Sequence, residues 1–342
     1  MEKFRGKSIA VIYASDSSEW EISCKSGRFT ASQIDGDRFD IYEVFARFGD
    51  WKVLATRVGG GERVELDPAP QVDKTDFSAV VDGKKVKFDY AYIMQHGIPG
   101  ESGQLQGYLQ MIGVPFSSCN SFVSTILFDK FSCKSYLKDV DFVSCAKDIF
   151  IRKGEALEGL EEKVGNRLGY PVFVKPTDGG SSLGVTKVKK AGDLKAAVDF
   201  AFEDSDTVLV EEAVNGREIT CAVYSDSESV KALPVIEIVT EREFFDYDAK
   251  YNGESEEICP ARLDAETTAR VQETSRKIYS HLGCSGLVRV DYILSGDRLY
   301  FLEMNTIPGM TAASLVPKMV RTAGLSMTDF LSGIIDSTAG RR

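Results

Sequence analysis

The chain has 342 residues, of which 43% are hydrophobic and 27% charged, and its formal net charge at pH 7 is −11. This length exceeds what one hydrophobic core usually fills, so we expect two or three domains. The negative charge disfavours nucleic acid and anionic membranes as partners, and no apolar run reaches the roughly 18 residues of a membrane helix.

The N-terminal apolar stretch, Ile9 to Ala14, is too short for a signal peptide, so we expect a cytoplasmic protein. Seven cysteines are scattered without a CxxC pair, which favours neither a disulfide framework nor a zinc site. Only His96 and His281 are present, which leaves oxygen donors as metal ligands. A bound metal would therefore be Mg²⁺ or Mn²⁺.

The first third of the chain reads as an open α/β domain with a parallel sheet. Lys7 to Ser15 is rich in Ile and Val and ends in small residues, which is typical of a parallel strand running into a ligand-facing loop. Residues 39–48 and 51–58 read as further strands. Residues 89–116 predict a strand, a Gly-rich loop, a helix from about Gln104 and a short strand. We place the domain boundary at residue 119.

A central domain is predicted for residues 120–212. Residues 121–140 read as helical, and a second helix over 156–169 is stopped by Gly169 and Pro171. Two strands should flank the stretch "VFVKPTDGGSSLG", residues 172–184, and a strand at 207–213 closes the unit.

A C-terminal domain is predicted for residues 213–342. We expect strands near 217–224 and 232–239, a long loop over 244–257, a helix over 264–282 and a hairpin over 287–304.

The stretch from Val172 to Gly184 is a candidate phosphate-binding loop. Small residues leave backbone N–H groups free to approach an oxyanion, and Lys175 at the end of the preceding strand supplies a positive charge. The GxxxxGK[ST] pattern of a Walker A loop is absent from it. The alternative reading is a flexible hairpin turn.

The hairpin over residues 287–304 carries a group of charged side chains. Alternation along the strands predicts that Arg289, Asp291 and Ile293 share one face. It also predicts a shared face on the returning strand for Leu299, Phe301, Glu303 and Asn305, with Asp291 and Glu303 as near-diagonal neighbours. Oxygen donors beside an arginine suit Mg²⁺ that bridges nucleotide phosphates. A salt-bridged surface hairpin is the alternative.

Seven stretches together resemble the D-alanine:D-alanine ligases of the ATP-grasp superfamily, and they lie in matching order from about residue 7 to 335. They are "SSEWEIS", "QHGIPGESGQLQG", "FDK", "VKPTDGGSSLG", "DYDAKY", "RVD" and "LEMNTIPGMT". The resemblance implies an ATP-grasp fold, in which an N-terminal α/β domain precedes two α+β domains that clamp ATP. It implies ATP-dependent ligation of two D-alanines through an acyl phosphate for peptidoglycan precursor synthesis, and a homodimer.

The resemblance also implies roles for individual residues. Those expected to bind ATP are Lys130, Lys175, Gly180, Ser182, Glu211, Glu212 and Glu218. Those expected to hold two Mg²⁺ or Mn²⁺ ions are Asp291, Glu303 and Asn305. Arg289 and the Gly309 N–H resemble the oxyanion donors. Glu19, with Ser181 and Tyr251, resembles the group that holds the first D-alanine. The expected substrate-binding residues beside them are His96, Lys250, Ser314 and Leu315.

The chain departs from the family pattern at Ala14, Ser15, Trp20 and Ser102, which bears on the shape of the first amino-acid pocket. Three other functions are alternatives. A D-alanine:D-hydroxy acid ligase, or another ATP-grasp ligase, is the nearest, and Tyr251 favours an amine as second substrate. A regulatory module without turnover is disfavoured by the hairpin residues. A dehydrogenase is disfavoured because "VGGGER" lacks the GxGxxG spacing.

Overall fold

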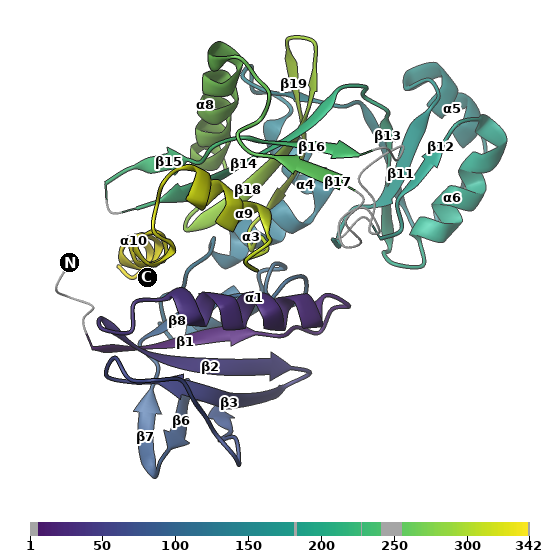
Figure 1. The fold of residues 1–342 in the computed structure, drawn as a ribbon. Helices are drawn as coiled ribbons and strands as arrows, with labels where there is room; N and C mark the ends of the chain where they lie inside the picture. The colour runs from purple at the N-terminus through teal and green to yellow at the C-terminus, as the bar shows by residue number, and fades with distance from the viewer. Residues whose placement is uncertain (1–5, 181–182, 227, 241–254, 341–342) are drawn as a thin grey trace.

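The computed structural model describes residues 6–180, 183–226, 228–240 and 255–340. Figure 1 shows an N-terminal unit, a C-terminal unit stacked on it and a smaller central unit beside the latter. The predicted fold class is confirmed, because the described residues form an N-terminal α/β unit with a largely parallel core sheet and two α+β units.

The N-terminal sheet has the strand order β4-β3-β2-β1-β8. Its strands are β1 (Lys7–Tyr13), β2 (Phe39–Arg47), β3 (Asp50–Arg57), β4 (Val64–Glu65) and β8 (Tyr90–Ile93). As predicted, β1 runs parallel to its neighbours β2 and β8, but β3 and β4 add an antiparallel edge. A small antiparallel sheet of β5 (Val72–Asp73), β6 (Ser78–Val81) and β7 (Lys84–Lys87) was not predicted.

Helix α1 (Trp20–Gln33) crosses from β1 to β2 and was also not predicted. Its buried positions follow helical spacing but hold small side chains: Ser23, Ser26, Gly27, Thr30 and Ala31. A Cβ atom on Gly27 would lie 2.3 Å from Tyr13 Cβ, so the helix packs very close to β1. Because the buried face carries no large apolar residue, hydrophobic periodicity could not reveal this helix.

The segment 121–140 is two helices, where the sequence predicted continuous helical structure. After the predicted helix α2 (Gln104–Met111), α3 (Ser121–Phe128) ends at Asp129 and α4 (Lys130–Leu137) begins. The Asp129 side chain accepts a hydrogen bond from the Ser132 N–H at 2.6 Å, so it caps α4 rather than continuing α3. The break makes Lys130 the first residue of α4.

The central unit is an antiparallel sheet with its own hydrophobic core. The strand order is β10-β13-β11-β12, with β10 (Asp148–Arg152), β13 (Thr207–Glu212), β11 (Val172–Pro176) and β12 (Thr186–Val188). Helices α5 (Leu160–Arg167) and α6 (Leu194–Ala201), with the short 3-10 helix η2 (Ala191–Asp193), accompany it. The predicted strands on either side of the small-residue loop are confirmed as β11 and β12.

The C-terminal sheet has the strand order β17-β16-β14-β18-β19-β9, and β15 pairs with β14. The strands are β9 (Ser144–Cys145), β14 (Arg217–Ser225), β15 (Val230–Ala232), β16 (Ile236–Thr240), β17 (Ser255–Ile258), β18 (Leu287–Ser295) and β19 (Arg298–Asn305). Helix α8 (Ala265–His281) matches the predicted helix. The prediction of a loop over 244–257 is wrong for residues 255–257, which belong to β17 and pair with β16. Most of the remaining predicted loop lies outside the described residues.

The β18–β19 hairpin contains a bulge that changes which side chains share a face. Asp291 pairs directly with Glu303, whereas Tyr292 pairs with Phe301, so Leu302 is an extra residue. Alternation therefore reverses at Leu302. The prediction that Leu299 and Phe301 share a face with Glu303 and Asn305 is wrong: the two apolar side chains are buried in the core with Tyr292. Asp291 and Glu303 are direct, not diagonal, neighbours.

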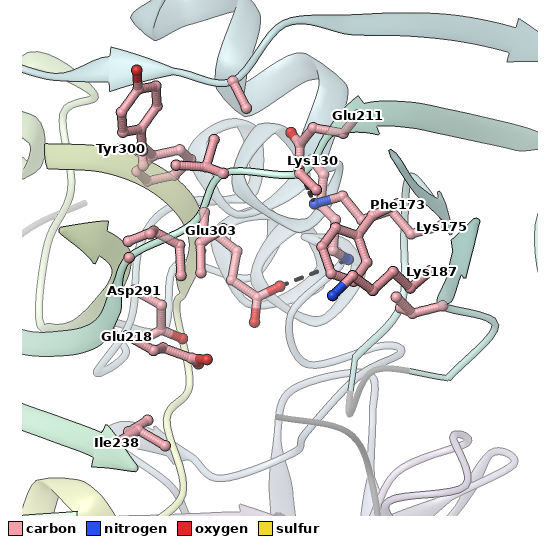
Figure 2. Close-up of a pocket in the computed structure, with 18 of the residues that line it drawn as sticks. Lys130, Phe173, Lys175, Lys187, Glu211, Glu218, Ile238, Asp291, Tyr300 and Glu303 are labelled. Atoms are coloured by element: carbon pink, nitrogen blue, oxygen red, sulfur yellow. Dashed lines mark hydrogen bonds and ion pairs between the residues drawn. The ribbon is translucent and has the colours of Figure 1, made fainter. Parts of the chain in front are cut away.

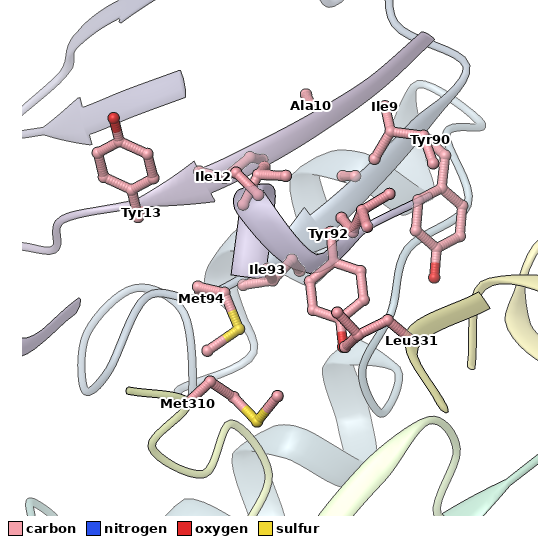
Figure 3. Close-up of a cluster of buried hydrophobic side chains, with 14 of the residues drawn as sticks. Ile9, Ala10, Ile12, Tyr13, Tyr90, Tyr92, Ile93, Met94, Met310 and Leu331 are labelled. Atoms are coloured by element: carbon pink, nitrogen blue, oxygen red, sulfur yellow. The ribbon is translucent and has the colours of Figure 1, made fainter. Parts of the chain in front are cut away.

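The N-terminal and C-terminal units share one hydrophobic cluster. It joins side chains of β1 and β8 to those of α9 (Leu315–Thr322) and α10 (Met327–Thr338), and Figure 3 shows Leu331 beside Tyr92 in it. Arg38 adds an ion pair with Asp336 at 2.9 Å. Helices α3 and α4 bury their apolar side chains with the C-terminal sheet. In the part of the chain that the structure describes, no helix combines the length and hydrophobicity of a membrane span.

Candidate active site

A cavity of about 450 Å³ lies between the central sheet and the C-terminal sheet. Strands β11, β12 and β13 supply one wall, and β14, β16, β18 and β19 supply the other. Figure 2 shows lysines on the first wall facing carboxylates on the second. The volume falls within the range of roughly 300–1,000 Å³ that is usual for small-molecule sites.

The first wall carries a buried cluster of two lysines around one carboxylate. Lys175, on β11, donates from Nζ to Glu211 Oε2 at 2.7 Å, and Lys134 donates to the other oxygen of Glu211. Lys134 also pairs with Asp148 at 2.6 Å. Burial alone would raise the pKa of Glu211, but Lys175 and Lys134 outweigh it and lower that pKa. The cluster fixes the Lys175 ammonium at the cavity surface.

Sequence reasoning missed Lys134, which is only 3% exposed. A signal was available, because Lys134 follows Lys130 by four residues and so lies on the same side of α4. Burial alone would lower the pKa of Lys134, yet Glu211 and Asp148 raise it above the usual lysine value. Lys134 is therefore a charged side chain inside the protein.

Lys130 connects the two walls near the small-residue loop. Its Nζ donates to the Gly179 carbonyl oxygen at 3.0 Å and lies 3.9 Å from Glu303 Oε2 on the opposite wall, the contact drawn in Figure 2. The backbone N–H of Lys130 donates to the Thr177 carbonyl oxygen at 2.7 Å. The first residue of α4 therefore contacts both the small-residue loop and the β18–β19 hairpin, so the three predicted motifs lie next to one another.

The second wall brings together the predicted hairpin residues. Arg289 donates to both oxygens of Asp291, at 2.9 and 2.7 Å, and Asn305 Nδ2 donates to Asp291 Oδ2 at 3.1 Å. Burial alone would lower the pKa of Arg289, but the Asp291 carboxylate raises it above the usual arginine value, with Glu303 adding to the effect. The guanidinium therefore stays charged in a buried position.

The predicted metal ligands form a compact set of oxygen donors. Asp291 and Glu303 are directly paired across the two strands, and Asn305 lies within hydrogen-bonding distance of Asp291. Among the described residues no three His, Cys, Asp or Glu side chains gather as a metal site, and the third predicted ligand is the Asn305 amide. Two carboxylates and an amide fit Mg²⁺ or Mn²⁺.

A further part of the cavity, called the slot below, is lined by apolar and charged side chains. Phe173 and Ile238 face it from opposite walls, and Lys187 Nζ lies 5.8 Å from the Phe173 ring centroid (Figure 2). Glu218 lines the slot from β14. Glu212 also lines it and accepts a hydrogen bond from the Lys147 N–H at 2.8 Å. An apolar slot rimmed by carboxylates suits a flat ring attached to a hydroxylated sugar.

Glu237 joins two arginines at the edge of this slot. Its carboxylate accepts hydrogen bonds from Arg217 at 2.9 and 2.8 Å and from the Arg262 side chain at 2.9 and 3.0 Å. Arg262 and Arg217 lower the pKa of Glu237 to about 2, against the effect of burial. Sequence reasoning missed this group, because its members are separated by 20 and 25 residues and follow no motif.

Glu19, immediately before α1, lies next to the small-residue loop. A Cβ atom on Gly180 would lie 3.0 Å from Glu19 Oε2, so the loop backbone and this carboxylate are close neighbours. Ser17 fixes the chain here, because its Oγ donates to the His96 carbonyl oxygen at 2.9 Å and accepts from the Glu19 N–H at 3.2 Å. The predicted residues Ser181, Ser182, Lys250 and Tyr251 lie outside the described residues.

The segment that follows β19 places Gly309 beside Ser314. A Cβ atom on Gly309 would lie 3.2 Å from Ser314 Oγ. Ser314 Oγ accepts from the Thr311 N–H at 2.9 Å and lies 2.8 Å from Thr311 Oγ1. Leu315 is the first residue of α9. The residues predicted for the oxyanion and for the second amino acid therefore adjoin one another.

This arrangement defines a class of protein. A small antiparallel sheet with lysines at its cavity face closes over a larger sheet with acidic residues, as in ATP-grasp enzymes. Models of the D-ala D-ala ligase N-terminus and the D-ala D-ala ligase C-terminus match residues 8–119 and 137–336. The chain belongs to the D-alanine–D-alanine ligase family, which confirms the resemblance seen in the sequence.

Relatives and solved structures agree along nearly the whole chain. A D-alanine–D-alanine ligase of Phocaeicola vulgatus is 45% identical over 97% of this chain and 99% of its own length. The VanG D-Ala:D-Ser ligase of Enterococcus faecalis has 32% identity and a TM-score of 0.82, covering 97% of this chain and 99% of that one. A Bacillus anthracis D-alanine–D-alanine ligase complexed with ATP has 29% identity and a TM-score of 0.74, covering 97% of each.

Proposed function

We propose that this protein joins two D-alanines to D-alanyl-D-alanine at the expense of ATP, releasing ADP and phosphate for peptidoglycan precursor synthesis. One observation carries the proposal: Lys130 and Lys175 face Asp291 and Glu303 across a cavity of about 450 Å³. That charge distribution suits a nucleotide triphosphate, and the relatives at 40–45% identity are D-alanine–D-alanine ligases.

The first step activates a carboxylate, because a carboxylate is a poor electrophile. Its oxygen attacks the γ-phosphorus of ATP, the bond to the β-phosphate oxygen breaks, and an acyl phosphate and ADP result. Lys130 and Lys175 neutralise phosphate charge, while the backbone of Gly179 and Gly180 approaches the phosphates. Glu19 lies next to Gly180, where it can hold the ammonium of the first D-alanine.

Asp291, Glu303 and Asn305 would hold Mg²⁺ or Mn²⁺. When bound, such ions neutralise the phosphate oxygens and align the triphosphate. The lysines alone would leave much of the charge of ATP uncompensated. We infer two ions from the resemblance to the family.

The second step forms the peptide bond. The neutral amine of the second D-alanine attacks the acyl carbon, phosphate leaves, and one proton is lost to solvent. Arg289 and the Gly309 N–H are the proposed donors to the oxyanion that forms meanwhile. Arg289 is buried and charged, which suits this role because its charge does not depend on pH in the physiological range.

Two other parts of the proposal follow from the resemblance: the homodimer, and the placing of the first D-alanine with Ser181 and Tyr251. The cytoplasmic location and the domain limits at 119 and 212 follow from the residue pattern along the chain. His96, Lys250, Ser314 and Leu315 are proposed around the amino-acid sites. Gly180, Ser182, Glu211, Glu212 and Glu218 are proposed to contact ATP.

A second candidate function is ligation of D-alanine to another second substrate. The structural similarity to a D-Ala:D-Ser ligase at 32% identity favours D-serine, and a D-hydroxy acid such as D-lactate is the further alternative. Phosphate release should be measured with D-alanine, L-alanine, D-serine and D-lactate, singly and in pairs. Release with D-alanine alone supports the proposal, and release only with D-alanine plus D-serine or D-lactate supports the alternative.

A further inference from the structure

The loop of residues 306–310, called loop 306–310 below, is held by side chains of the N-terminal unit. It follows Asn305 and carries Gly309, the proposed oxyanion donor. Ile307 and Met310 are buried in the cluster shared by the two units, and Figure 3 shows Met310 there with Ile12 and Met94. Apolar packing keeps the loop against the N-terminal unit but does not by itself fix the direction of each N–H group.

Two polar side chains hold the peptide groups on either side of Ile307. His96 Nδ1 lies 2.9 Å from the Ile307 carbonyl oxygen, and Glu101 Oε1 accepts a hydrogen bond from the Ile307 N–H at 3.3 Å. The other Glu101 oxygen accepts from the Gly97 N–H at 2.8 Å. Both backbone groups of one residue in the C-terminal unit are therefore bonded to a single short loop of the N-terminal unit.

The hydrogen-bonding pattern determines which nitrogen of His96 carries the proton. A carbonyl oxygen only accepts, so Nδ1–H donates to Ile307. Ser26 Oγ lies 3.0 Å from His96 Nε2 and accepts from the Met310 N–H at 3.3 Å, so its own hydrogen is available for Nε2. A neutral imidazole satisfies both contacts, and burial lowers the pKa of His96 in the same sense. Ser26 is fully buried on α1.

Hydrogen bonds also connect His96 to Glu19, the residue proposed to hold the first D-alanine. The Ser17 hydroxyl donates to the His96 carbonyl oxygen at 2.9 Å, and it accepts from the Glu19 N–H at 3.2 Å. The His96 backbone thus supports the chain at Glu19, whereas the His96 ring contacts the loop that bears Gly309. Glu19 acts in both steps of the proposed reaction, whereas the Gly309 N–H acts only in the second.

We infer that His96 and Glu101 are positioning residues for the second step: by holding both backbone groups of Ile307, they aim the Gly309 N–H at the oxyanion. The inference rests on the proposed function. In it His96 acts through the loop, because both of its ring nitrogens are bonded to protein groups. An oxyanion donor has to be in place before charge develops, and a buried hydrogen-bonded anchor provides such preorganisation.

Glu101→Gln is the sharpest variant. Burial and the Glu19 carboxylate raise the pKa of Glu101 to about 8, while Gly97, Ile307 and Arg289 favour its ionised form. In either protonation state its two oxygens accept from two N–H groups. Glutamine keeps the shape but turns one acceptor into an NH₂ donor, so one N–H loses its partner. We expect dipeptide formation to slow roughly tenfold.

The measurement is a rapid-quench single turnover with enzyme in excess over ATP, in the presence of Mg²⁺ and labelled D-alanine. ADP reports the first step and dipeptide the second. The wild type should form both together. Glu101→Gln should form ADP at a rate within about twofold of the wild-type rate, and should form dipeptide at a rate roughly tenfold lower than that of the wild type. The KM for ATP should be unchanged.

Glu43→Gln is the matched control. Glu43 is a buried carboxylate of the same unit, bonded to the Tyr13 hydroxyl at 3.1 Å and to Arg63, and it lies outside the cavity. Replacing Glu43 should lower the melting temperature, while ADP and dipeptide should still form at the same rate as each other. His96→Asn and His96→Ala provide a second pair of variants. The asparagine NH₂ can still donate to the Ile307 carbonyl oxygen, so the delay of dipeptide formation behind ADP formation should be smaller in His96→Asn than in His96→Ala.

Two results separate the inference from the proposed function. If the wild type forms dipeptide, and ADP and dipeptide are slowed equally or not at all in Glu101→Gln and His96→Ala, the positioning role is wrong. If the wild type forms no dipeptide from D-alanine, the proposed function is wrong, and the inference with it. A lag of dipeptide behind ADP in the control variant would also contradict the inference.

Discussion

Replacing Glu237 by glutamine should weaken the fold in a manner that depends on pH. The Glu237 side chain is 5% exposed and bonded to both Arg217 and Arg262. The pKa of this carboxyl is about 2, against the ordinary value of 4.5. A difference of about 2.5 pH units corresponds to about 3.4 kcal/mol of folding free energy at neutral pH. Because the Arg262 side chain is 60% exposed, solvent screening reduces this to about 1–2 kcal/mol.

The sign follows from the lowered pKa. The ionised carboxylate stabilises the folded state fully above the unfolded pKa of about 4.5, and this contribution disappears as pH falls toward 2. About a quarter of it should be lost by pH 4 and more than half by pH 3. The wild type and Glu237→Gln should therefore differ most at pH 7 and converge at low pH, since a protonated glutamate resembles glutamine.

The assay is urea denaturation of both proteins at pH 7, 5, 4 and 3, followed by far-ultraviolet circular dichroism. Glu228→Gln is the control, because that side chain is 81% exposed and lies 3.9 Å from Lys231 on the same sheet. Its denaturation midpoint should match the wild type at each pH. A difference between wild type and Glu237→Gln that stays constant from pH 7 to pH 3 would refute the assignment of the ion pair as the source of stability.

Three further outcomes are expected. Glu303→Gln should keep the fold and lower turnover about a hundredfold at ordinary Mg²⁺, with partial recovery at high Mg²⁺; near-normal turnover in a Mg²⁺ titration would contradict the metal assignment. Lys175→Ala should weaken ATP binding at least tenfold by calorimetry with little change in melting temperature, because Glu211 keeps Lys134 as partner. Lys134→Met should cost on the order of 2–3 kcal/mol of stability, since it removes the most deeply buried ammonium, which pairs with both Glu211 and Asp148, and leaves Asp148 without this partner; equal melting temperatures for the two lysine variants would contradict this ordering.

Several features of the fold could be predicted from the sequence because they depend on neighbouring residues. The β-branched run at Lys7–Tyr13 forms a parallel strand, and Gly179 and Gly180 lie between two strands beside Lys175. Helix α8 keeps its expected length because Asp264 caps it, accepting from the Thr267 N–H at 2.7 Å. Motif order along the chain was also sufficient to identify the family.

Other features depend on contacts that no local pattern records. Helix α1 buries serines and a glycine, so its packing against Tyr13 is visible only in three dimensions. The bulge at Leu302 reverses the alternation on which the strand prediction was based. The break at Asp129 depends on a cap, whose side chain competes with helix continuation.

By itself, the sequence determined the chemistry available to this protein: which residues carry charge, where small residues open the backbone, and which family those motifs match. Only the tertiary structure decided how that chemistry is held. Lys134 and Glu211 are 77 residues apart and Glu101 and Ile307 are 206 apart, yet each pair is in contact. Such contacts form because a buried polar group is costly without a partner, and the partner is supplied by whichever segment the fold brings near.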